Sequence, residues 1–74
     1  MPDYLYLTDR EIQVLRAHRD TGAPPKTDNP VENTLNVAAG AGLVKRGYIT
    51  NRWFSKRWPL TRAGRAVLKK AEGE

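Results

Sequence analysis

The sequence predicts an α+β fold, mostly helical, with three helices and a β-hairpin in the C-terminal half. Capping signals predict three helix starts, at Thr8, Asn29 and Thr61. Between the second and third of these, residues 48–60 are rich in aromatic and β-branched side chains, which is typical of paired strands. A length of 74 residues leaves room for one core only. We therefore expect a single domain over 1–74, with its core in 7–70.

The first predicted helix begins after Thr8. Glu11, three residues later, completes a capping box, and Leu7 can pack against Ile12 as a hydrophobic staple. Gly22 is expected to end the helix in the left-handed conformation. Residues 21–30 follow with three prolines, so they are predicted to form a loop.

The second predicted helix has Asn29 as its cap, Pro30 at its first position and Glu32 reaching back to the cap. It is expected to end at Gly47. Its interior contains Gly40-Ala41-Gly42, and each glycine costs about 1 kcal/mol relative to alanine. The helix therefore either breaks there or is approached closely, and we favour a close helix–helix contact over a close approach of DNA.

The predicted hairpin pairs 48–54 with 57–60. Pro59 cannot donate to a strand ladder, so the second strand is expected to be short or to lie at an edge. At least two of the three hairpin aromatics are expected to pack in the core rather than stack on unpaired bases; they are Trp53, Phe54 and Trp58.

The third predicted helix is capped by Thr61, and residues 71–74 are expected to fray. Four of its side chains are expected to point inward: Ala63, Ala66, Val67 and Leu68.

Charge is divided unevenly along the chain, although the net charge is only +5. Residues 1–44 carry four basic and six acidic side chains, a net of −2, whereas 45–74 carry nine basic and two acidic, a net of +7. No carboxylate side chain lies between Glu32 and Glu72. Nine cations without local acidic partners are therefore expected to be free to meet phosphates.

Two segments of this basic half resemble the C-terminal part of bacterial winged helix-turn-helix regulators. One is Gly-Leu-Val-Lys-Arg-Gly-Tyr-Ile at 42–49, and the other is Leu-Thr-Arg-Ala-Gly-Arg-Ala-Val-Leu at 60–68, with a basic hairpin between them. Their order and spacing match the family, and the resemblance covers about 7–70. It implies a winged helix-turn-helix fold that binds duplex DNA, in a small transcriptional regulator or phage accessory factor.

The resemblance also implies the contacting residues. Helix 31–46 would be the recognition helix, with its early residues nearest the bases: Asn33, Thr34, Asn36 and Val37. The wing, 48–60, would contribute Arg52, Lys56 and Arg57. Backbone contacts would come from Lys45, Arg46, Arg62 and Arg65.

Two departures from the family affect this interpretation. Turn-forming residues at 24–30 stand where a short second helix is expected, and the recognition helix carries no Lys or Arg before Lys45. Much of the affinity would then come from the wing and last helix, with modest sequence selectivity and a steep salt dependence.

The residues for other chemistries are missing. The chain has no cysteine and one histidine, so we expect no disulfide, metal site, cofactor or nucleophile pair, and no enzyme activity. His18 is expected to lie on a helix surface. No signal peptide or membrane span is predicted, so a cytoplasmic protein is expected. A chain of 74 residues is too short for the extra dimerisation helices of many such repressors, so we expect a monomer or weak homodimer.

Two other functions fit the same pattern. A winged domain can act as a protein-interaction module, for example a phage protein that docks on an acidic host protein. The hairpin aromatics could instead bind RNA or single strands. Duplex binding predicts an affinity that falls steeply with salt concentration. A protein partner would be captured in a pull-down even after nuclease treatment, and RNA or single-strand binding predicts a preference for unpaired substrate.

Overall fold

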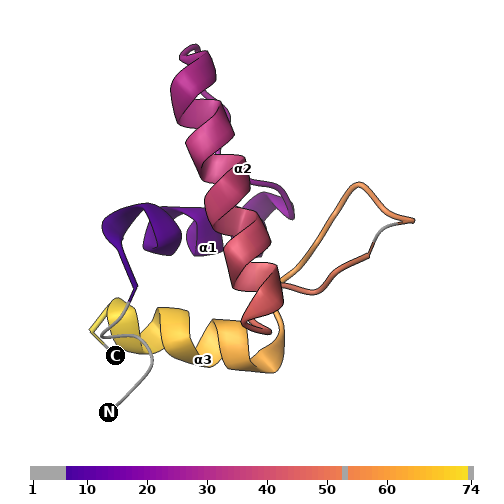
Figure 1. The fold of residues 1–74 in the computed structure, drawn as a ribbon. Helices are drawn as coiled ribbons and strands as arrows, with labels where there is room; N and C mark the ends of the chain where they lie inside the picture. Colours follow the sequence, from indigo (N-terminus) through magenta and orange to yellow (C-terminus); the bar gives the residue numbers. More distant parts are fainter. Residues whose placement is uncertain (1–6, 53, 74) are drawn as a thin grey trace.

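Three helices arranged around one core make up the computed structural model, which describes residues 7–52 and 54–73 (Figure 1). They are α1 (Asp9–Thr21), α2 (Pro30–Lys45) and α3 (Arg62–Ala71). α1 packs against both of the others, and the N-terminal half of α2 extends beyond α1 (Figure 1). The expectation of a mostly helical domain is confirmed.

All three predicted helix caps are confirmed. The Thr8 hydroxyl accepts from the Glu11 amide at 3.1 Å, and the Glu11 carboxylate accepts from the Thr8 amide at 2.9 Å. Asn29 and Thr61 accept from amides of their own first turns, and Gly22 ends α1 with φ of 75°. These bonds join residues two or three positions apart, so the local sequence is sufficient to specify them.

Glu32 does not reach back to its cap as predicted. Its carboxylate instead lies 2.8 Å from the guanidinium of Arg10 on α1. The Asn29 N–H, which Glu32 would accept in a capping box, instead donates to the Thr27 hydroxyl at 3.1 Å, so the Glu32 carboxylate is available for a cation on another helix.

The core gathers apolar side chains from all three helices and from the segments flanking 50–59. Its buried members are Val14, Leu15, Leu43, Tyr48, Ile49, Leu60, Val67 and Leu68. Most of these residues lie where the helix patterns place an inward face, and each stabilises the fold by removing apolar surface from water.

The inward face of α3 differs from the prediction at its start. Val67 and Leu68 are buried as expected, but Ala63 and Ala66 are exposed, and Gly64 is buried. A Cβ at position 64 would overlap the backbone carbonyl of Tyr48. The first turn of α3 therefore lies directly on the backbone that follows α2, and only glycine permits this approach.

α2 continues without a break through 40–42. A Cβ built at Gly40 would lie 3.6 Å from Nε2 of His18 and 3.7 Å from Val14, both on α1. This confirms the close helix–helix contact at Gly40. Gly42 differs, because a Cβ there would meet nothing within 4 Å.

The predicted β-hairpin is not seen as paired strands among the described residues. Ile49 and Leu60 form one isolated antiparallel bridge, flanked by Thr50 N–H donating to the Pro59 carbonyl at 2.8 Å and Thr61 N–H donating to Tyr48 at 3.0 Å. Pro59 has no N–H with which to bond Thr50 in return. The ladder therefore cannot extend outward by the regular pattern.

Of the hairpin aromatics, Trp58 is half-buried against the core, whereas Phe54 is 76% exposed. Trp53 lies outside the described residues, so the expectation that at least two of the three pack in the core stays a prediction.

The C-terminal tail differs in part from the prediction. In the segment expected to fray, Glu72 caps α3 and its carboxylate contacts two arginines of α1. These contacts join positions more than 50 apart, which explains why the tail composition did not indicate them.

Candidate nucleic-acid interface

Eight of the nine cations in 45–74 are exposed and have no acidic partner among the described residues. They are Lys45, Arg52, Lys56, Arg57, Arg62, Arg65, Lys69 and Lys70. By contrast, the three arginines of α1 all pair with carboxylates, Arg10 with Glu32 and both Arg16 and Arg19 with Glu72. The unpaired positive charge of 45–74 therefore lies on the segment 50–59, on α3 and at the end of α2, and Lys26 is a further exposed cation without an acidic partner among the described residues.

Arg46 is the exception among the nine. Its guanidinium lies 3.3 Å from the Glu11 carboxylate and 5.0 Å from the centroid of the Tyr48 ring. Glu11 lies 35 positions earlier in the chain. The sequence around Arg46 contains no carboxylate, so it gave no sign that Arg46 has an acidic partner. The geometry gives Arg46 a role in joining the end of α2 to α1.

The segment 50–59 is fixed at its base to the end of α1. Trp58 N–H donates to the Gly22 carbonyl at 2.7 Å, and the Trp58 carbonyl lies 2.8 Å from Nδ1 of His18. Within the segment, the Trp58 indole N–H donates to the Ser55 carbonyl at 3.0 Å. From this base the segment projects away from the helices (Figure 1), with the exposed side chains of Arg52, Lys56 and Arg57.

Two of the side chains predicted to read bases are engaged inside the protein. Asn36 is only 4% exposed; its Oδ1 accepts from Arg10 at 2.9 Å, and its Nδ2 donates to the Pro25 carbonyl at 3.2 Å. Asn33 is half-buried and exchanges hydrogen bonds with Thr27. In this conformation neither amide is presented to a DNA groove, and both join the 21–29 segment to α2.

The other two predicted base readers, Thr34 and Val37, are exposed on α2. The Thr34 hydroxyl donates to the Pro30 carbonyl at 3.0 Å, one turn back, which leaves its methyl group accessible. Val37 is 58% exposed and borders a cavity. Of the four early α2 positions, these two can reach a partner without rearrangement.

The prediction that His18 lies on the helix surface is wrong, because the residue is only 5% exposed. Gly40 lies beside Nε2 of the ring, and the Trp58 carbonyl accepts a hydrogen bond from Nδ1–H of His18. Burial lowers the pKa of His18 below the usual 6.5, and the bond to Trp58 opposes this effect only in part. The ring is therefore neutral at pH 7, with its lone pair on Nε2.

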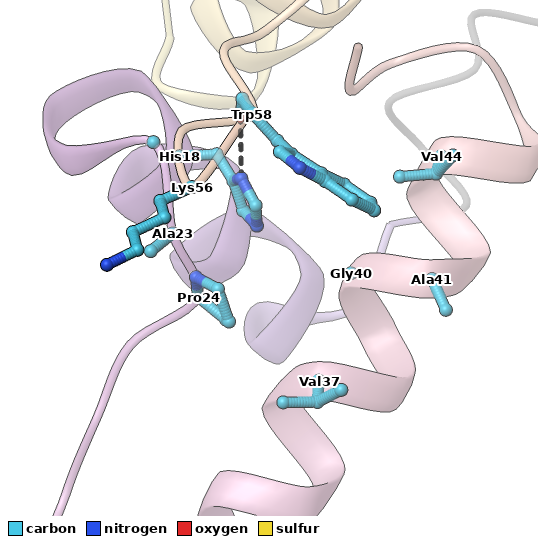
Figure 2. A pocket seen from close by; sticks show the side chains of 10 residues that line it. His18, Ala23, Pro24, Val37, Gly40, Ala41, Val44, Lys56 and Trp58 are labelled. Carbon is cyan, nitrogen blue, oxygen red and sulfur yellow. Dashed lines mark hydrogen bonds between the residues drawn. The ribbon is translucent and has the colours of Figure 1, made fainter. Parts of the chain in front are cut away.

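A cavity of about 320 Å³ lies between the end of α1, the middle of α2 and Trp58 (Figure 2). Its α2 wall is apolar, formed by Val37, Gly40, Ala41 and Val44. Sequence reasoning did not identify this cavity. Its parts come from separate segments, and only the interior glycine at position 40 gave a local signal of close packing.

Other kinds of site are not indicated in the part of the chain that the structure describes. No three His, Cys, Asp or Glu side chains there are grouped so as to hold a metal ion. None of the described helices is both long enough and apolar enough to cross a membrane. In the comparisons with known proteins, no family model, curated protein or solved structure matches this chain.

Proposed function

We propose that this chain is a winged-helix domain that binds duplex DNA, in a small transcriptional regulator or phage accessory factor. In this proposal 48–60 is the wing, and DNA is held mainly by the wing and α3. The observation that carries the proposal is the set of eight exposed cations in 45–74 that have no acidic partner among the described residues. Such cations are the groups that displace counterions from phosphates.

The arrangement of cations on α3 supports this function. Arg62, Arg65 and Lys69 are spaced i, i+3 and i+7, so they follow one another along one side of the helix. The opposite side packs on the core through Val67 and Leu68. A row of charges with this spacing matches contact with a phosphate backbone, which positions a protein on DNA without reading its sequence.

Helix α2 has a reduced role in this proposal compared with a typical recognition helix. It has no charged residue between Glu32 and Lys45, and Asn33 and Asn36 are engaged internally. Thr34 and Val37 are left to contact bases, through apolar contact with thymine methyl groups. We therefore expect weak sequence preference and strong dependence on salt.

The test is a titration of random-sequence duplex at several salt concentrations, read by fluorescence anisotropy. The logarithm of the association constant should fall linearly with the logarithm of salt concentration, by about 0.9 for each phosphate neutralised. Replacing Arg52 and Lys56 with alanine should weaken binding and reduce this slope by about 2. Arg57 is left in place because its guanidinium also donates to the Thr21 carbonyl.

The matched control is the double variant Arg16→Ala/Arg19→Ala. It changes the net charge by the same amount but removes arginines that are paired with Glu72. We expect a salt slope close to that of the unchanged protein. Equal effects of the two double variants would show that only net charge matters, and a salt-independent or undetectable affinity would contradict the proposal.

A second candidate function is a protein-interaction module, which is favoured by exposed apolar side chains on α2. Among the described residues, the exposed large apolar side chains are Val31, Leu35, Val37 and Phe54, and the first three lie in one half of α2. A helix half with exposed apolar side chains and no cation suits a protein surface better than phosphates.

The two functions are separated by a variant of this helix half. Val31→Thr/Leu35→Gln leaves all the cations in place. It should retain duplex binding if the wing and α3 hold DNA. The second candidate would be supported by two results together. The unchanged protein would not bind duplex DNA but would capture a protein partner after nuclease treatment, and the variant would no longer capture that partner.

A further inference from the structure

The cavity beside His18 combines apolar walls with one fixed hydrogen-bond acceptor. Val37, Ala41 and Val44 line one side, and the Trp58 indole extends from the opposite side toward Val44 (Figure 2). Small-molecule sites in proteins are typically concave and apolar with a few fixed polar groups, and about 320 Å³ lies at the small end of their range.

The hydrogen bonds of the His18 ring determine which polar group faces the cavity. Nδ1 lies 2.8 Å from the Trp58 carbonyl oxygen, and a carbonyl only accepts, so Nδ1 carries the hydrogen. In the neutral ring Nε2 is then an acceptor. Among the described residues, every fully buried side-chain nitrogen or oxygen has a hydrogen-bond partner. Nε2 has no protein partner there, so it is not fully buried. Because His18 lines the cavity, Nε2 is reached from the cavity.

Gly40 keeps this nitrogen accessible. A Cβ at that position would lie 3.6 Å from Nε2, in ordinary contact with it. The Trp58 indole N–H is already bonded to the Ser55 carbonyl, so it does not compete for a molecule in the cavity. Nε2 is therefore the side-chain group that would orient a bound molecule.

The charge of the occupant follows from the same walls. The charged residue that borders the cavity is Lys56, which is exposed, and Figure 2 shows its ammonium group pointing away from α2. An ionised molecule would lose its hydration in the cavity without gaining a fixed opposite charge. The walls therefore favour an uncharged molecule.

We propose that this cavity binds a free, small, uncharged aromatic molecule that carries one N–H or O–H donor. Its ring would pack against Trp58 and the α2 side chains, and its donor would bond to Nε2 of His18. Val37 and Lys56 border the cavity and also belong to the proposed DNA contacts. This proposal still does not depend on DNA binding, because the groups that would hold the molecule, Trp58 and Nε2 of His18, are not among those contacts and its test contains no DNA.

The first experiment compares indole with benzofuran, which has the same shape but an ether oxygen in place of the N–H. Both are titrated into the ¹⁵N-labelled protein and followed by amide shifts. Indole should bind about fivefold more tightly than benzofuran, since one net hydrogen bond is gained. Its shifts should centre on Ala23, Gly40, Ala41, Val44 and Trp58.

The second experiment uses a matched pair of glycine substitutions on α2. Gly40→Ala places a methyl group against Nε2 without a clash, whereas Gly42→Ala adds the same group in open space. Both replace a helix glycine by the same residue, so both should fold. Indole affinity should fall severalfold in Gly40→Ala and stay unchanged in Gly42→Ala.

Three results would overturn the proposal. Equal affinities for indole and benzofuran would remove the role of Nε2, and shifts that spread over the surface or stay absent up to the solubility limit would remove the site. Tighter binding of N-acetyl-tryptophanamide than of indole would show that the cavity takes a side chain of a partner protein instead of a free molecule.

Discussion

The two ends of α2 are held by different interactions. In the C-terminal half, Leu43 is fully buried and Gly40 packs against α1. In the N-terminal half, Glu32 and Asn36 both contact Arg10, while Val31 and Leu35 remain exposed. The comparison shows that a few polar contacts can orient one end of a helix and still leave its apolar side chains available to a partner.

The largest effect should come from removing an apolar side chain at the packed end. Leu43→Ala should lower the free energy of unfolding by about 3 kcal/mol, because the smaller side chain leaves a cavity where a fully buried leucine was packed. Leu35→Ala, the same change at the exposed end, should cost less than about 1 kcal/mol. Urea unfolding followed by circular dichroism measures both. Similar losses would contradict the contrast between the ends.

A second effect tests the backbone contact beyond the packed end of α2. Gly64→Ala should destabilise the protein by about 2 kcal/mol, because its Cβ would overlap the Tyr48 carbonyl and force the first turn of α3 to shift. The control is Gly42→Ala, which should stabilise by up to about 1 kcal/mol, since nothing lies near the added methyl group. Stabilisation by both substitutions would mean that α3 does not lie on this carbonyl.

The polar end of α2 is tested by Asn36→Ala. This change removes the acceptor for Arg10 and the donor for the Pro25 carbonyl, so we expect a loss of about 1 to 2 kcal/mol in the free energy of unfolding. Unchanged stability would contradict the role of these two bonds, and a loss of sequence preference would show that Asn36 contacts DNA bases after a rearrangement. Thermal unfolding and a duplex titration distinguish these outcomes.

The smallest predicted effect is a pH dependence at the junction of α1, α2 and the 50–59 segment. Burial lowers the pKa of His18 below 6.5, so the unfolded chain binds a proton more readily than the folded protein does. The contribution of His18 is therefore complete above about pH 7 and decreases as the pH falls through 6.5 toward the lower folded pKa. Urea unfolding between pH 8 and 5.5 should show this decrease, and His18→Gln should remove it.

The helix boundaries could be predicted because their determinants are local. Thr8, Asn29 and Thr61 each bond to an amide two or three residues away, and Gly22 adopts its left-handed conformation at the end of its own helix. The candidate site was predicted only in part. The exposed cations of 50–59 and of α3 lie in the predicted segments, but Arg46, Asn33 and Asn36 have partners within the fold.

The sequence by itself determined where the helices start, which half of the chain is basic and why Pro59 limits strand pairing. Only the tertiary structure decided that His18 is buried, that α3 lies on the Tyr48 backbone and that a cavity forms beside Gly40. The physical reason is the distance along the chain over which each interaction acts. Caps and charge runs depend on near neighbours, whereas burial and close backbone contacts depend on segments that meet only in the folded protein.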